Sequence, residues 1–319
     1  MTAWSRLNRG ETTIDFVGLR KRWFIISAVA IVIALASLGI RGLNLGIEFV
    51  GGLTMQSPNP ANAQLEDIRD DMTEVGIEDV TIQFLNDGES VLVTTPVVED
   101  TTAAAAADAL ADVTGSDRSE VSIQAVGPSF GALVLQRALI ALAVFLGAVV
   151  LFISWRLEFK MAIAGLAALG HDLLITVGVY SLTGFTVTPA TVVAVLTILG
   201  YSLYDTVVVF DKVEELIETE EEMNITEIVN RAMNQVLARS LNTSLTSLLP
   251  VGSILFVGSF ILGAPTLREF ALALFVGIAA GTYSSIFVAS PILAVWKEKE
   301  PFWIDRRDKV GRRGKSKKR

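Results

Sequence analysis

The sequence predicts an α-helical polytopic membrane protein, with six transmembrane helices and one extracytoplasmic ferredoxin-like α/β domain. Of its 319 residues, 51% are hydrophobic and only 19% are charged, a balance atypical of soluble domains of this length. Several apolar stretches reach about 18 residues or more, and roughly 20 residues cross a hydrocarbon core of ~30 Å. The acidic segment 44–132, in contrast, shows strand and helix patterns.

Six apolar stretches are expected to span the membrane. They cover residues 23–40, 138–155, 161–185, 190–210, 240–262 and 270–296. The first transmembrane helix is assigned to 23–43, and the other five form a bundle within 133–296. Ala34-Leu35-Ala36 resembles a signal-peptide cleavage site, but the apolar run continues to Ile40, which favours an uncleaved anchor.

Basic residues predict the orientation. The N-terminus 1–22 is basic, and the tail 297–319 holds 11 Lys/Arg against four Asp/Glu. An even number of spans places both ends on one side, and positive charge marks the cytoplasmic side. We therefore expect a multi-pass protein of the cytoplasmic (inner) membrane with both termini cytoplasmic. The tail is interpreted as a topology signal, so no nucleic acid is expected as a partner.

Segment 44–132 holds 16 Asp/Glu and two Arg, and in this orientation it lies outside the cytoplasm. Asn86-Asp87-Gly88 predicts a hairpin turn. The expected order β-α-β-β-α-β is ferredoxin-like. No enzyme motif occurs in the segment, which favours a binding or contact domain. The expected strands are Gly46–Ser57, Val80–Leu85, Ser90–Thr95 and Glu120–Val126, and the expected helices are Ala61–Val75 and Thr101–Val113.

Residues 212–238 form the predicted cytoplasmic loop between the fourth and fifth spans. Apolar residues recur there at helical spacing, namely Ile225, Ile228, Val229, Met233, Val236 and Leu237. This pattern predicts a helix that lies along the membrane face.

The residue types limit the chemistry. The chain has no cysteine and one histidine, which excludes disulfide bonds, thiolate chemistry and multi-histidine metal sites. We therefore expect no metal site, and with no catalytic motif we expect a protein that is not an enzyme.

Charges inside a membrane are costly and face a cavity or a partner. Asp172, preceded by His171, lies about 11 residues into the third span, near mid-membrane. Asp205 lies in the inner half of the fourth span, at the depth where Arg239 opens the fifth. Asp205 and Arg239 are therefore predicted to pair, with Asp205 binding and releasing a proton; a static ion pair is the alternative. For His171 and Asp172, a structural role and a proton relay stay equally open.

One aspartate in each of two adjacent spans also suggests an intramembrane aspartyl protease. Tyr204-Asp205 resembles half of such a pair. Leu169-Gly170-His171-Asp172 lacks the Gly-x-Gly-Asp of the other half, and the depths of the aspartates differ. This alternative is the weakest of those considered.

GLNLGIEFVGG, residues 42–52, follows the first span and is a candidate hinge or domain junction. Gly46, Gly51 and Gly52 permit backbone conformations that other residues resist. Glu48 would lie at the membrane rim, and a tight turn alone does not account for it.

One predicted helix is rich in small polar side chains, in the stretch ARSLNTSLTSLLP (residues 238–250). Such side chains permit close helix packing or line a hydrated proton path. These residues are Ser240, Asn242, Thr243, Ser244 and Thr246. Gly277, Gly281, Ser284 and Ser285 form a similar small face on the sixth span.

Taken together and in order, these stretches resemble the SecF family of protein-export membrane subunits. GLNLGIEFVGG is similar to the family's Gly-Ile-Asp-Phe-x-Gly-Gly segment, and VGPSFG (126–131) to the stretch that leads into the second span. His171-Asp172 fits the family's His-Asp pair. TVVAVLTILGYSLYDTVVVFDKVEE (191–215) and RSLNTSLTSLLP (239–250) resemble its two most specific signatures.

The resemblance implies a subunit of the resistance–nodulation–division superfamily, with Asp205 and Arg239 in a proton path. It implies a SecD partner with a matching six-span half, beside the Sec channel formed by SecY, SecE and SecG. The implied function is use of the proton-motive force to promote export of polypeptides, with an ion gradient, H⁺, and no cofactor. Exported polypeptide and membrane lipids complete the expected partners.

Half of a proton-coupled exporter of small molecules or lipids, from the same superfamily, is the alternative; the small outer domain disfavours it. Two residues depart from the family's pattern. Glu48 stands where Asp is usual, and Tyr204 stands where Asn is common, beside the key carboxylate. Tyr204 leaves open whether the coupling ion is H⁺ or Na⁺.

Overall fold

Six helices are long and apolar enough to cross a membrane within residues 12–258 and 265–307, which this computed structural model describes. Their number agrees with the six expected spans. They are α2 (Arg20–Arg41), α6 (Pro128–Arg156), α7 (Phe159–Thr183), α8 (Pro189–Thr219), α9 (Ile225–Ser253, continued by the π-helical turn Ile254–Gly258) and α10 (Pro265–Ser284, continued by the π-helical turn Ser285–Ala289 and α11, Ser290–Lys297).

Local sequence sets the ends of these helices. Pro128 and Pro189 lie in the first turn of α6 and α8, where a missing N–H breaks no helical bond. The side chains of Thr188 and Asn224 cap α8 and α9 by accepting a hydrogen bond from a backbone N–H of the first turn. Gly184 ends α7 in the left-handed conformation that favours glycine.

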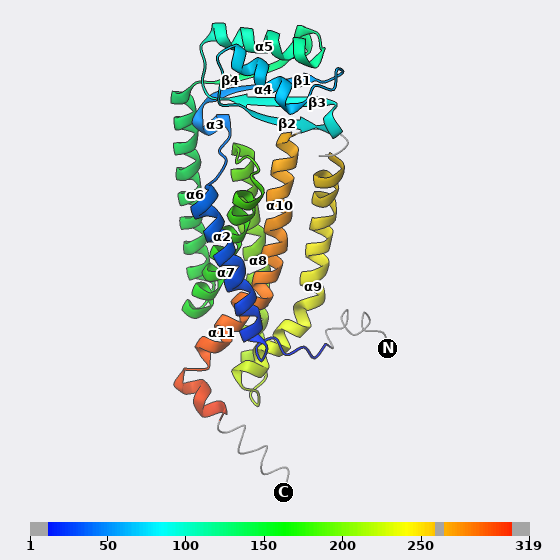
Figure 1. Cartoon of the computed structure of the whole chain (residues 1–319). Coiled ribbons are helices and arrows are strands. Elements are labelled where there is room, and N and C mark those ends of the chain that lie inside the picture. Colours follow the sequence, from blue (N-terminus) through cyan, green and yellow to red (C-terminus); the bar gives the residue numbers. More distant parts are fainter. Residues whose placement is uncertain (1–11, 259–264, 308–319) are drawn as a thin grey trace.

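The bundle has a buried centre and a lipid-facing shell. In the apolar stretches of α7, α8 and α10, 44–56% of the residues are buried, against 11–17% for α2, α6 and α9. Figure 1 shows α2 and α6 along one side of the bundle and α9 along the other. Outward apolar side chains are favourable here because lipid tails are as apolar as they are.

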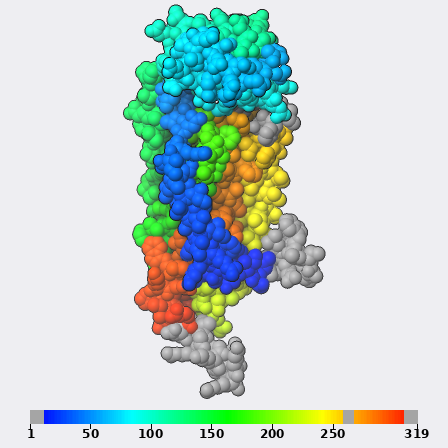
Figure 2. Space-filling view, viewed as in Figure 1, coloured from blue at the N-terminus to red at the C-terminus, as the bar shows by residue number. Residues whose placement is uncertain are grey.

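The α/β domain follows α2 in the chain and caps one end of the bundle, which we call the domain end (Figures 1 and 2). The first and last described residues lie at the opposite end of the bundle, which we call the terminal end. Within the described residues its strands form one antiparallel four-stranded sheet in the order β2-β3-β1-β4, which confirms the ferredoxin-like pattern. The elements are α3 (Ile47–Val50), β1 (Gly52–Pro58), α4 (Leu65–Glu74), β2 (Thr81–Leu85), β3 (Ser90–Thr95), α5 (Asp100–Thr114) and β4 (Ser122–Val126).

The two faces of this sheet differ. Helices α4 and α5 cover the face away from the bundle (Figure 1). Met55, Val93, Ile68 and Leu110 are buried there in one apolar core. The other face points toward the bundle and presents threonine and glutamine side chains, because side chains alternate between the two faces of a strand.

The chain before α2 is fastened to the terminal end of α9. Asn234 donates from its amide to the carbonyl of Ile14 and accepts from the Ile14 N–H, both at 2.9 Å. The Val17 N–H donates to the side chain of Asn230 at 3.0 Å. Phe16 and Val17 are buried in the main core of the bundle.

Three expected boundaries differ from the structure. Gly46–Ser57 is not one strand, because Ile47–Val50 is helical and Gly51 turns the chain, at φ 80°, into β1. The domain boundary at 132 falls inside α6, which already begins at Pro128. The fourth and fifth spans extend into the predicted loop 212–238, so that only residues 220–224 connect α8 and α9.

The prediction that Ile225–Leu237 lies along the membrane face is wrong. Its apolar side chains are buried in the main core of the bundle, because the start of α9 packs against α8 and α11. Helical spacing locates an apolar face but does not say whether protein or lipid covers it. The expected end of the fifth span at 262 and the segments 1–11 and 308–319 lie outside the described residues.

Candidate functional site

Two buried carboxyl groups lie inside the bundle on neighbouring helices. Asp172 on α7 is 0% exposed, and Asp205 on α8 is 6% exposed. Among the described contacts, the one ion-pair partner of either is His171, next to Asp172 in the chain. Serine hydroxyls supply the other partners.

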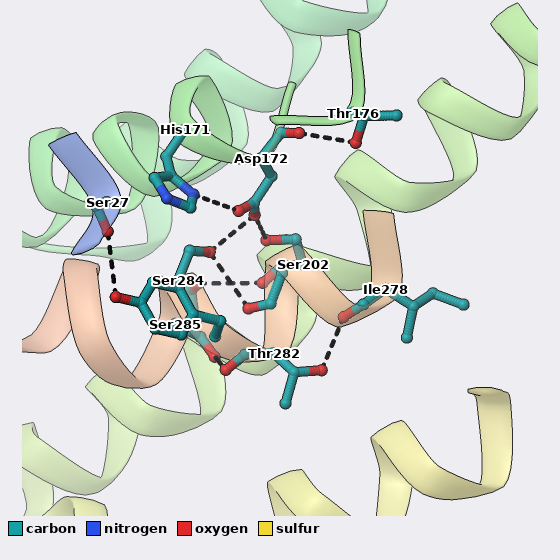
Figure 3. Close-up of polar contacts among 12 residues, drawn as sticks. Ser27, His171, Asp172, Thr176, Ser202, Ile278, Thr282, Ser284 and Ser285 are labelled. Carbon is teal, nitrogen blue, oxygen red and sulfur yellow. Dashed lines mark hydrogen bonds and ion pairs between the residues drawn. The ribbon is translucent and has the colours of Figure 1, made fainter. Parts of the chain in front are cut away.

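Asp172 joins three helices (Figure 3). Ser202 on α8 and Ser284 on α10 both donate to its Oδ2, at 2.6 and 2.8 Å. Nδ1 of His171 lies 3.0 Å from Oδ1. Both oxygens of this carboxyl group therefore have partners without contact to water.

Asp205 is held in the same way, by α9 and by the continuation of α10. Ser240 on α9 donates to its Oδ1 at 2.6 Å. Ser285, at the start of the π-helical turn after α10, donates to its Oδ2 at 2.5 Å. The two aspartates thus depend on adjacent serines of one helix, and we call Asp172, Ser202, Asp205, Ser240, Ser284 and Ser285 the serine–aspartate cluster.

The π-helical turn allows two consecutive residues to serve two different sites. Ser290 donates to the carbonyl of Ser285, five residues back, at 2.9 Å. Such a turn widens the helix locally, and π-bulges are frequent at functional sites. Ser284 and Ser285 therefore reach α7 and α8 from the same stretch of chain.

Small residues bring α10 close enough to α8 for these bonds. A Cβ at Gly281 would lie 2.9 Å from the Cβ of Ser202, and one at Gly277 only 2.3 Å from Ile198. Glycine lets helix backbones approach closely in a membrane. The small face predicted on the sixth span therefore packs against α8.

The predicted ion pair between Asp205 and Arg239 is not formed. The guanidinium of Arg239 instead donates to Oη of Tyr204 at 2.7 Å, and it lies 5.9 Å from the centre of that ring. Consecutive residues on a helix point about 100° apart. Since Ser240 faces Asp205, Arg239 is turned to the outer surface, where Tyr204 is 55% exposed.

His171 connects the cluster to α2. Its ring stacks on Tyr283, with ring centres 5.9 Å apart. The hydroxyl of Tyr283 donates to the carbonyl of Trp23 at 3.1 Å and accepts from Ser27 at 3.3 Å. This arrangement is compatible with both roles left open for His171, the structural one and the relay.

The polar residues predicted on α9 divide between two faces. Ser240 and Ser244 are buried, and the Ser244 hydroxyl lies 2.6 Å from that of Thr282. Asn242 and Thr246 are exposed on the other side. Thr243 is half-buried, and its hydroxyl, like that of Thr246, bonds to carbonyls of its own helix. Asn242, Thr243 and Thr246 therefore do not join the buried cluster.

The predicted junction lies where the α/β domain meets the bundle, and it is tightly packed. A Cβ at Gly51 would lie 2.9 Å from Cα of Pro128, and one at Gly52 would lie 2.6 Å from the carbonyl oxygen of Thr95. The side chain of Glu48 folds back over Gly46. A hinge at this junction stays a prediction.

Sequence reasoning missed Ser202, which lies in the same span as the stronger signal of Asp205. It stands three residues before Asp205, so it lies on the same helix face one turn away. That spacing is the signal that would have found it.

Two further arrangements of carboxylates can be compared with the structure. In the described part of the chain, no three His, Asp or Glu side chains meet in a group able to hold a metal ion. Asp172 and Asp205 accept hydrogen bonds from different hydroxyls, and no described bond joins their carboxyl groups as in an aspartyl protease dyad.

Comparison with known families agrees with the fold and the motifs. The family described as "Protein export membrane protein SecD/SecF, C-terminal" matches residues 105–299, and the "SecD/SecF GG Motif" matches residues 36–56. The protein translocase subunit SecF of Streptomyces coelicolor is 41% identical over 303 residues, which cover 94% of this chain and 81% of the relative. That of Pseudomonas aeruginosa is 33% identical over 285 residues, 89% of this chain and 91% of the relative.

Solved structures show the same architecture. SecDF from Thermus thermophilus, a translocon-associated membrane protein, matches 91% of this chain with a TM-score of 0.80 and 32% identity. A second SecDF structure, in a super-membrane-facing form, matches 95% with a TM-score of 0.64. The present chain spans 39% and 40% of the length of those two chains. By sequence and structure, the chain belongs to the SecD/SecF family of protein-export membrane proteins, among relatives named SecF.

Proposed function

We propose that this chain works with a SecD-like partner to promote export of polypeptides across the cytoplasmic membrane, driven by an ion gradient. The serine–aspartate cluster supports the proposal best. It places two groups that can bind a proton deep in the bundle and joins them to four helices through hydroxyls. A proton that arrives at or leaves Asp205 changes contacts to α9 and α10 together.

Two serine hydroxyls donate to the carboxyl group of Asp205, and no described cation faces it. Burial of an unpaired charge is costly. Loss of the proton would call for a cation, and Arg239 is the residue next to Ser240 on α9. A turn of α9 by about 100° would exchange Ser240 for Arg239. Proton binding and release would thereby move α9 against α8.

The partner would cover the outer surface around Arg239. Arg239, Tyr204, Asn242 and Thr246 are exposed in membrane-spanning helices, where contact with lipid is unfavourable for polar groups. A second membrane subunit would supply acceptors for them. The solved SecDF chains, which are more than twice as long as the matched part, fit a SecD-like half beside this one.

The rest of the assembly follows from charge and position. The basic termini favour a cytoplasmic terminal end and an outer α/β domain. The domain would contact exported polypeptide near the Sec channel. We propose H⁺ as the coupling ion, with Na⁺ as the alternative.

The decisive experiment measures export into vesicles with and without an ion gradient. Asp205→Asn keeps the shape and removes the titrating group, so it should abolish the gradient-dependent part of export. Asp211→Asn is the matched control, because Asp211 lies on the same helix in an exposed ion pair with Arg156. A full response of Asp205→Asn to the gradient, at normal membrane levels, would refute the proposal.

A further inference from the structure

A polar cavity lies at the domain end, between the sheet and the bundle. It measures about 190 Å³, which leaves room for several water molecules. Its roof is the uncovered face of the sheet, where every strand contributes alternate residues such as Thr54, Gln56 and Gln83. Its floor is the loop before α8 and the first two turns of α10, including Thr186 and Glu269.

Two carboxylates from different parts of the molecule line this cavity. Glu48 belongs to α3, at the base of the domain, and Glu269 belongs to α10 of the bundle. Glu269 is only 5% exposed. Thr186 lines the same cavity. Two carboxylates in one cavity favour a proton or a cation between them.

One arginine lies near Glu269, outside the lining of the cavity. Arg268 precedes Glu269, but its guanidinium lies over the ring of Phe185, 4.8 Å from the centre, and it donates to Gln83 at 3.4 Å. Arg268 does not line the cavity, and Glu48 and Glu269 are its two charged lining residues among those described. The cavity therefore has the chemistry of a site for a small cation.

One face of α10 leads from this cavity to the serine–aspartate cluster. Glu269, Ala273, Gly277 and Gly281 follow one another at intervals of four residues, and Ser284 comes next. Four residues are about one helical turn, so these positions share a face. Over the 15 residues from Glu269 to Ser284 the helix rises about 22 Å.

An apolar contact blocks the path along this face of α10, between the cavity and the serine–aspartate cluster. Tyr180, Ala194, Ile198 and Ala273 are buried together below the cavity. Ile198 lies directly against Gly277. The hydroxyl of Tyr180 donates to the backbone carbonyl of Glu269, so the cavity and this apolar contact share a helix and a hydrogen bond.

We propose that the cavity is the entrance site for the coupling ion, a monovalent cation that Glu269 and Glu48 bind before it passes along α10. The contact of Ile198 with Gly277 is the seal that opens to let it through. This inference rests on the proposed function, and it adds a second site about 22 Å from the first along α10.

The first test compares carboxyl variants in vesicles, with a proton gradient alone and with a sodium gradient alone. Glu269→Gln and Glu48→Gln should lose most of the export driven by whichever gradient is active, while Glu66→Gln, an exposed carboxylate on α4, should keep it. If Asp205→Asn loses the response and both cavity variants keep it in full, the entrance site is wrong. If Asp205→Asn keeps the response too, the proposed function itself fails.

A second test does not depend on activity. The chain has no cysteine, so a single introduced thiol reports its own surroundings. A membrane-impermeant methanethiosulfonate added on the domain side should label Gln56→Cys, in the roof, and leave Ala273→Cys, in the seal, unlabelled. Protection of Gln56→Cys, or equal labelling of both thiols at rest, would overturn the proposal.

Discussion

The α/β domain and the helix bundle distribute polar side chains in opposite ways. In the domain, carboxylates lie on the outside and residues such as Met55 and Leu110 are buried. In the bundle, Val144 and Leu151 are exposed while Asp172 and Asp205 are buried. One rule explains both regions: a polar group needs water or a partner, and only the domain has water around it.

Buried hydroxyls also serve the two regions differently. In the domain, Ser57 bonds to Thr114 at 2.9 Å and to Ser116 at 2.7 Å, and all three groups are neutral. In the bundle, the serine hydroxyls bond to carboxyl groups, which change charge when they gain or lose a proton. The first arrangement holds a fold, whereas the second would, under the proposed function, respond to an ion gradient.

The largest effect should come from the domain core. Leu110→Ala removes a fully buried side chain and should lower the free energy of unfolding of the domain by about 2–5 kcal/mol. Leu65→Ala, at the exposed start of α4, is the control. Limited proteolysis of the membrane-embedded protein should cut the domain of Leu110→Ala at much lower denaturant. Equal resistance of both variants would contradict a core centred on Leu110.

A smaller effect is expected at the junction. Gly51→Ala places a side chain at φ 80° and close to Pro128, so it should cost about 1–3 kcal/mol for the backbone, with further cost from crowding. Gly147→Ala on α6, where no atom lies within 4 Å of the added Cβ, should be tolerated. Thermal stability of the purified variants in detergent measures the difference, and similar values would mean that the junction is loosely packed.

Removal of a cluster hydroxyl should cost about as much as one buried hydrogen bond. Ser285→Ala leaves one oxygen of Asp205 without its donor and should destabilise the protein by about 1–3 kcal/mol. Ser253→Ala, whose exposed hydroxyl bonds only to its own helix at 2.9 Å, should have little effect. Gradient-driven export should fall for Ser285→Ala alone. Unchanged export would make Ser285 a packing residue.

The smallest effects concern the surface carboxylates of the domain, where two pKa shifts have opposite signs. Hydrogen bonds from Ser119 lower the pKa of Asp117, so its stabilising effect is present at neutral pH and is lost as the pH falls through that lowered value. Burial and the nearby Glu74, Asp67, Asp70 and Asp112 raise the pKa of Asp71. Asp71 therefore favours the fold at low pH, and this contribution is lost as the pH rises through its raised value.

Melting curves between neutral and acidic pH test these signs. At neutral pH, Asp117→Asn should lower the melting temperature of the domain slightly, and Asp71→Asn should raise it slightly. Both differences should shrink in acid. The same sign for both variants at neutral pH would contradict the electrostatic account.

Strong periodic signals made much of the fold predictable. The strand Ser90–Thr95 is as expected, and β2 and β4 begin within two residues of their expected starts, because alternation and turn residues are local properties of the chain. Helix ends inside the bundle were less predictable. The last residues of α8 are polar, and this composition suggested that a loop begins at residue 212. The helix in fact continues to Thr219.

The candidate site was predictable by residue type but not by pairing. Asp172 and Asp205 are buried, as expected for a carboxylate in an apolar stretch, which has few acceptable positions. Depth along the spans suggested Arg239 as the partner of Asp205, and it was wrong because depth carries no information on rotation about the helix axis.

The sequence by itself determined the six apolar spans, the βαββαβ domain and the presence of charge inside the membrane. These features depend on the composition of each segment and on the spacing of its apolar residues, which are local properties of the chain. Only the tertiary structure decided that Ser240 rather than Arg239 faces Asp205, and that Ser284 and Ser285 bond to different aspartates. Those contacts depend on how each helix is rotated, and the rotation is set by close packing such as that of Gly277 and Gly281 against α8.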